Sequence, residues 1–98
     1  MERYIVYDGG MILLNYESRI NKGIATMKDN GDCLRFADML DEVDNIDVQM
    51  VSYGDGHASI SFVSDLDSHE FLSSVCEVAS DCFESPICVH YVRQENII

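Results

Sequence analysis

The four cysteines and three histidines are the side chains best suited to nucleophilic or metal chemistry. Structural zinc sites use pairs of cysteines separated by two to four residues. Here Cys76, Cys82 and Cys88 follow one another at intervals of six, and Cys33 stands apart. Cys33, Cys76 and Cys82 instead fall on the apolar faces of expected helices, where a free cysteine packs as a small hydrophobe. We therefore expect no metal and no cofactor.

A cysteine–histidine pair, formed by Cys82 or Cys88 with His90, is the enzymatic arrangement that the residue types suggest. No orienting residue or oxyanion motif accompanies it in the sequence. The glycines at 8–10 and 54–56 fit turns and match no phosphate-binding loop. The sequence therefore predicts no catalytic residues and a protein that is not an enzyme.

Carboxylates are the abundant chemical group, and their distribution is uneven. No Lys or Arg occurs between Phe36 and Val92, yet that stretch contains 12 of the 18 Asp and Glu residues. The six remaining acids are matched by the six bases, so the formal net charge of −12 belongs to this stretch. A net charge of about 2–8 is enough for solubility, and excess unpaired charge weakens the compact state. The excess indicates a positively charged partner.

Hydrophobic periodicity predicts the elements that must position these acids. The expected strands are residues 4–7, 11–16, 22–28, 46–53, 57–64 and 87–92. One helix follows Asn30 or Asp32, either of which can serve as its N-cap, and ends at Asp44-Asn45. A second helix, with Asp67 in a capping box, extends to Glu84 before Pro86 ends it.

From about residue 22 to 92 this order is βαββαβ, the order of the ferredoxin-like plait. The prediction is an α+β fold in a single domain, residues 1–98, with a β-hairpin preceding the plait. The sheet should be antiparallel, with both helices on one face. If the strand at 22–28 does not form, residues 11–16 could supply the first strand of the plait.

Four acids of the second helix form a row, because their spacing of seven, four and three residues keeps them within about 60° of arc. The row spans about 21 Å at the helical rise per residue. The first helix and the loop after it add further acids without a base between them. The candidate partner-binding residues are Glu70, Glu77, Asp81, Glu84, Asp38, Asp41, Glu42, Asp44 and Asp47. The simplest alternative is that the row is only the solvated face of an amphipathic helix.

Charge and hydropathy also limit the expected location and partners of the protein. An acidic surface would repel phosphates, so direct binding of nucleic acid is disfavoured. The longest apolar run, Met11–Leu14, is too short to span a membrane, and Met1–Tyr4 lacks the features of a secretory signal. We expect a cytoplasmic protein, in the host cytoplasm if it is virus-encoded, with reduced thiols.

The leading hypothesis is a non-enzymatic inhibitor or decoy that mimics nucleic acid and docks on a basic nucleic-acid-binding protein. In size and composition the chain resembles small acidic virus-encoded inhibitors of the anti-restriction or anti-CRISPR type, although it carries no motif of one such family. The alternative is a regulatory or assembly module that homodimerises, or binds a partner, through its sheet and N-terminal hairpin. That alternative expects Tyr4, Tyr7, Ile12 and Leu14 to be exposed.

Overall fold

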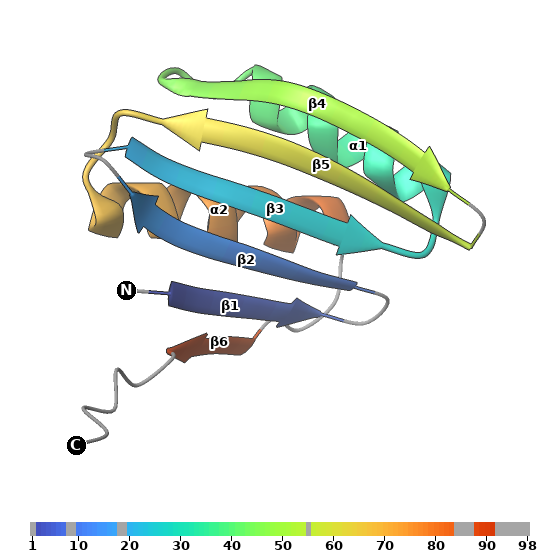
Figure 1. Ribbon diagram of the computed structural model, residues 1–98, viewed down its shortest axis with the longest axis horizontal. Coiled ribbons are helices and arrows are strands. Elements are labelled where there is room, and N and C mark those ends of the chain that lie inside the picture. The colour runs from blue at the N-terminus through green and yellow to red at the C-terminus, as the bar shows by residue number, and fades with distance from the viewer. Residues whose placement is uncertain (1, 8–9, 18–19, 55, 84–87, 92–98) are drawn as a thin grey trace.

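One antiparallel sheet and two helices on one of its faces make up the protein (Figure 1). The structure is a computed structural model, and it describes residues 2–7, 10–17, 20–54, 56–83 and 88–91, of which 2, 17 and 88–91 are described by their backbone. The predicted α+β class, with an antiparallel sheet and two helices, is confirmed.

Six strands and two helices occur in the described residues, in the order predicted from periodicity. The strands are β1 (Glu2–Tyr7), β2 (Gly10–Glu17), β3 (Ile20–Met27), β4 (Ile46–Gly54), β5 (His57–Ser64) and β6 (Cys88–Tyr91). The helices are α1 (Asn30–Asp41) and α2 (Ser68–Phe83). The strand predicted at 22–28 does form, beginning two residues earlier.

The strand order β4-β5-β3-β2-β1-β6 differs from the ferredoxin-like plait, whose order is not confirmed. The part β4-β5-β3 agrees with the plait, which would next place β6 beside β3. Instead the N-terminal hairpin lies between them, and β6 pairs with β1. The physical reason is that short connections make β1, β2 and β3 a meander, so β2 occupies the edge of β3 that the plait leaves for the last strand.

Each helix begins at an aspartate cap. For α1 the cap is Asp29 rather than either predicted residue, Asn30 or Asp32, and its Oδ1 accepts a hydrogen bond from the Asp32 N–H at 3.1 Å. Asp29 has the extended backbone that a cap requires, whereas Asn30 is already helical. The predicted cap of α2 is confirmed, because Asp67 Oδ1 accepts from the Glu70 N–H at 2.9 Å.

The hydrophobic core lies between the sheet and the two helices. Phe36 of α1 and Phe71 of α2 both meet the ring of Phe62 on β5, at centroid distances of 6.3 and 5.8 Å. Gly23 of β3 makes room for Phe62, since a Cβ at this position would lie 2.3 Å from that ring. The core therefore fixes each helix on the same side of the sheet.

Candidate partner-binding surface

The acidic row of α2 is exposed, as its spacing predicts. Glu70, Glu77 and Asp81 lie on the solvent side of the helix. At 100° per residue they fall within about 40° of arc and rise about 16 Å along the axis. The opposite side contributes the buried residues Phe71, Val75, Val78, Ala79 and Cys82. Glu84, the fourth residue of the predicted row, lies outside the described residues.

The acids of α1 and of the turn after it are exposed as well. Asp38, Asp41, Glu42 and Asp44 all face solvent, while Cys33, Phe36, Ala37 and Leu40 form the buried side. Asp41 and Asp81 lie in the last turns of their helices, and neither last turn contains a base. An acid near the negative end of a helix dipole is unfavourable, by about 0.3–1 kcal/mol at an exposed site. Folding alone gives no reason for this placement.

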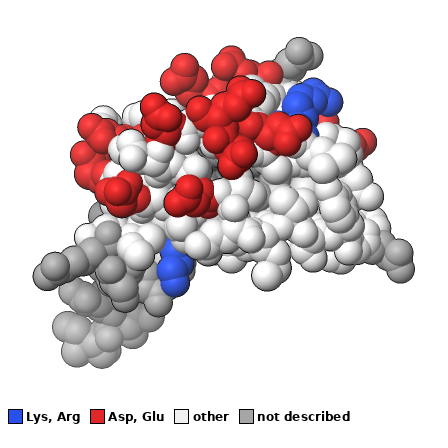
Figure 2. Space-filling view, turned by 90° about the horizontal axis from the view of Figure 1, so that it is seen from above, with Lys and Arg blue, Asp and Glu red and all other residues white. Residues whose placement is uncertain are grey.

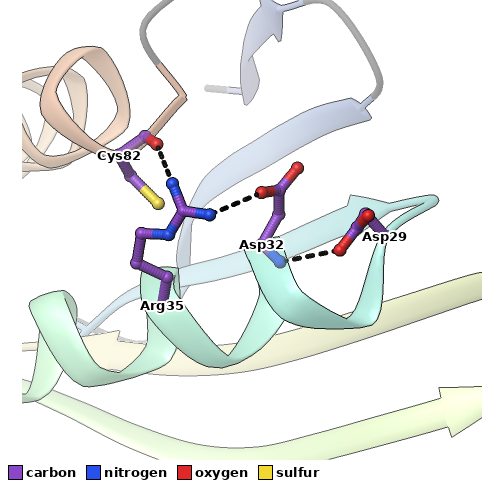
Figure 3. Close-up of polar contacts among 4 residues, drawn as sticks. All are labelled: Asp29, Asp32, Arg35 and Cys82. Carbon is purple, nitrogen blue, oxygen red and sulfur yellow. Dashed lines mark hydrogen bonds and ion pairs between the residues drawn. The ribbon is translucent and has the colours of Figure 1, made fainter.

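Arg35 of α1 bonds to both helices (Figure 3). Its Nη1 donates to the Cys82 carbonyl oxygen and its Nη2 to Asp32 Oδ1, both at 3.2 Å. The bond to Cys82 joins the second turn of α1 to the last turn of α2, and the two helices run in opposite directions (Figure 1). Arg35 places a cation at the C-terminal end of α2, where the helix dipole favours it.

Acidic side chains gather on the helical side of the molecule (Figure 2). Figure 2 views the molecule from above the β4 edge of Figure 1, so the helices lie toward the upper part of the picture. The lower part, on the side of the open sheet face, is mostly uncharged. The two helices therefore bring acids that are far apart in the sequence onto one surface. We call the exposed acids of this surface the helical acidic face: Asp38, Asp41, Glu42, Glu70, Glu77 and Asp81.

Two predicted site residues that the structure describes are not part of this face: Asp44 lies in the turn after α1, and Asp47 lies on β4. Asp47 pairs with Val63 of β5, and its side chain belongs to the set of strand residues that points away from the helices. The preceding β4 residue, Ile46, is buried on the helical side. Asp47 is a candidate in the sequence because it closely follows the acids of α1. The pleat of β4 directs its side chain to the opposite side of the sheet.

The cysteines whose side chains are described pack in the core rather than line a site. Cys33 and Cys82 are buried and Cys76 is half-buried, and burial raises the pKa of all three thiols. A thiol with a raised pKa is a weaker nucleophile at neutral pH because less of it is ionised. No group of three or more metal-ligating side chains occurs in the part of the chain that the structure describes.

The hairpin residues proposed for the alternative interface are mostly not exposed. Tyr7, Ile12 and Leu14 are buried against the helices, and Tyr4 is half-buried on the other face. The Tyr7 ring stacks on Phe83 with centroids 4.0 Å apart, and its hydroxyl donates to the Thr26 carbonyl oxygen at 3.3 Å. The prediction that Tyr7, Ile12 and Leu14 are exposed is wrong. In a continuous apolar run, the sequence does not show which of the two alternating sets of side chains faces the core.

A buried cation, Arg3, connects β1 to the beginning of α2. Its Nη1 donates to the Ser68 carbonyl oxygen at 2.9 Å, while its Nε has no hydrogen-bond partner in the structure. Arg3 is 6% exposed, so it offers no open site to a ligand. Its positive charge lowers the pKa of Cys76, although burial of that thiol has the larger effect and raises it.

Two surface hollows lie at opposite ends of the sheet. One, of about 460 Å³, is lined by Met11, Thr26, His57 and their neighbours. The other, of about 390 Å³, includes Ile20 and Asp47. Neither gathers a cluster of titratable groups of the kind that marks an active site.

No protein-family model, no curated protein and no solved structure matches this chain. Among the described residues, no helix is long and apolar enough to cross a membrane.

Proposed function

We propose that this protein is a non-enzymatic inhibitor or decoy that docks its helical acidic face on a basic nucleic-acid-binding protein. The observation that supports the proposal is the separation of charge: acids from both helices share one surface, and the sequence places no Lys or Arg between Phe36 and Val92. A surface kept acidic only for solubility would mix signs and gain i,i+4 ion pairs.

The spacing of the carboxylates suits a groove built for a nucleic-acid backbone. Glu77 and Asp81 are one helical turn apart, and the row from Glu70 to Asp81 covers about 16 Å. Duplex DNA presents one phosphate charge per about 1.7 Å of axis, so the row offers a sparser but rigid set of charges. A basic cleft would attract it by long-range steering, which raises the association rate more than the final affinity.

The helical acidic face also carries acids at positions that weaken the fold. Asp41, Glu42 and Asp81 lie at helix C-termini, and Glu77 and Asp81 are like charges at i,i+4. Such costs are easily removed by substitution to Gln, Asn or Lys. Their presence together favours a binding role over a purely solvating one. In its concrete form the proposal is a virus-encoded protein of the anti-restriction or anti-CRISPR type.

The test compares two double variants that remove the same charge. Glu77→Gln with Asp81→Asn neutralises two acids of the row of α2, and Asp47→Asn with Asp65→Asn neutralises two exposed acids that are not part of the helical acidic face. Each protein is immobilised and exposed to cell lysate, and captured proteins are released with a short DNA duplex. The captured protein should be a nucleic-acid-binding protein that the duplex displaces, and the row variant alone should lose it.

Salt provides the second readout of the same experiment. Exposed charge pairs are screened over about 8 Å at physiological ionic strength, so capture should weaken steadily between about 50 and 500 mM salt. Capture that the row variant retains, or that a DNA duplex does not displace, would show that the helical acidic face is not a nucleic-acid mimic.

A further inference from the structure

The face of the sheet away from the helices is mainly apolar over β1, β2 and β3. An antiparallel sheet with one solvated face usually alternates apolar and polar residues, and β5 does so with Ser59 and Ser61 on the open side. On β1 to β3 the open side is mainly apolar, and the polar exceptions among its described side chains are Asn15, Lys22 and Thr26. The apolar open-side residues include Tyr4, Val6, Met11, Leu13, Ile20 and Ile24. A contiguous exposed apolar patch with polar residues around it is typical of an interaction surface.

The strand register places these side chains in a continuous row across the sheet. Tyr4 lies opposite Leu13, Leu13 opposite Ile24, and Ile24 opposite Ser61. Met50 of β4 continues the row on the far side of Ser61. Ile24 is 49% exposed and Met50 is 63% exposed, so the row is open to solvent in the single chain.

We propose that this open face binds a second copy of the chain, with two sheets stacked face to face about a two-fold axis. The five strands β1 to β5, about 4.8 Å apart and about eight residues long, present a face on the order of 600 Å², in which β1 to β3 are the apolar part and β4 and β5 a more polar margin. Two such faces bury on the order of 1,200 Å² in total, which reaches the range of stable protein interfaces. A two-fold pairing of identical patches is the commonest symmetric arrangement.

The charge of the open face suits a second copy. Among the described side chains at open-face positions of the strands, Lys22 carries one positive charge and Asp47 one negative charge, so this part of the face is nearly neutral. Stacking two open faces also directs both helical acidic faces outward. With sheets about 10 Å apart and a helical layer on each, the two acidic faces are on the order of 30 Å apart. That separation exceeds the screening length of about 8 Å, so their repulsion is weak.

The sheet edges are poorly suited to compete with this pairing. β4 carries a bulge between Val48 and Met50, and β6 is four residues long. Bulges and short edge strands are the features by which proteins prevent edge-to-edge association. The open face is therefore the favoured surface for self-association.

Sedimentation equilibrium with two matched variants tests the proposal. Ile24→Glu places a charge in the centre of the open face, and Leu34→Glu places the same charge on α1, where Leu34 is 52% exposed. The wild type and Leu34→Glu should be dimers at about 10–100 µM, because the interface is of standard size. Ile24→Glu should weaken self-association at least about 100-fold, since an unpaired charge would be buried at the interface.

Met50→Glu is a second variant on the same row for the case that Ile24→Glu does not fold, as judged by circular dichroism. The wild-type dimer should persist at about 0.5 M salt, because salt screens the repulsion between the copies without weakening apolar burial. A wild type that is monomeric at about 100 µM overturns the proposal, as does a folded open-face variant that dimerises as well as Leu34→Glu.

Discussion

The helical acidic face and the open face of the sheet lie on opposite sides of the same core, and they carry opposite kinds of chemistry. The helices expose carboxylates without bases in their last turns, whereas β1 to β3 expose apolar side chains with little charge. A charged surface repels a second copy of the chain, whereas an apolar surface attracts it. One surface could therefore not both bind a basic partner and associate with a second copy well. Under the two proposals made above, their separation lets the two surfaces act independently, one toward a basic partner and one toward a second copy of the chain.

The largest expected effect comes from the residues that hold the two faces together. Phe62 points from β5 into the core, and its neighbour Ser61 points to the open face. Phe62→Ala should lower the free energy of unfolding by about 3–5 kcal/mol, because it removes the contacts with Phe36 and Phe71. Ser61→Ala should change it by less than about 0.5 kcal/mol. Urea unfolding of the two variants measures the difference, and equal effects would show that the sheet faces are not assigned correctly.

Alkaline pH should weaken the same core. Burial raises the pKa of Cys33, Cys76, Cys82 and Tyr7 above their ordinary values. The unfolded chain then ionises first, so stability is complete below about pH 8 and falls as pH rises through the ordinary thiol and tyrosine range. Because the shifts of all four groups have the same sign, we expect their losses to add between about pH 8 and 11.

The variant Tyr7→Phe tests the tyrosine part of this pH dependence. It keeps the ring that stacks on Phe83 and removes the ionisable hydroxyl. Its unfolding free energy should therefore fall less steeply above about pH 10 than that of the wild type. Urea unfolding at a series of pH values gives the comparison, and parallel curves would exclude a contribution from Tyr7.

The N-cap of α2, which positions part of the helical acidic face, should make a smaller contribution to the free energy of unfolding. Asp67→Ala removes the acceptor for the Glu70 N–H and should cost about 1 kcal/mol of stability. In the same variant, the rate of amide hydrogen exchange in the first turn of α2 should rise. Asp65→Ala, two residues upstream and also exposed, is the matched control and should leave both measurements nearly unchanged. A cap variant as stable as that control would contradict the role assigned to Asp67.

The smallest effect on stability is expected from substitutions in the acidic row of α2. The informative result is whether they raise or lower the free energy of unfolding. Glu77→Gln with Asp81→Asn should raise the free energy of unfolding by a few tenths of a kcal/mol, because like charges at i,i+4 are unfavourable. The gain should shrink at high salt. Thermal unfolding at low and high salt measures it, with Asp47→Asn and Asp65→Asn as the control of equal charge. A loss of stability would mean that the row supports the fold.

Local structure was largely predictable because it depends on short-range patterns. Asp67 was identified as a cap from its own side chain and its position before an apolar helical period. Ala58, Ile60 and Phe62 were assigned to the core because β5 alternates with serines. The hairpin offered no such contrast, since residues 4–7 and 11–14 are apolar on both sides. Tyr7, Ile12 and Leu14 were therefore assigned to the wrong face.

By itself the sequence determined the elements, the α+β class and the acidity of the helices, because periodicity, capping and charge are local properties of the chain. The tertiary structure decided which strand β6 joins, since that depends on the edge already taken by the hairpin. It also decided that Asp47 lies apart from the helical acids and that Ile24 and Met50 share a row. These relations depend on strand register and pleat, which bring together residues that are distant in the sequence.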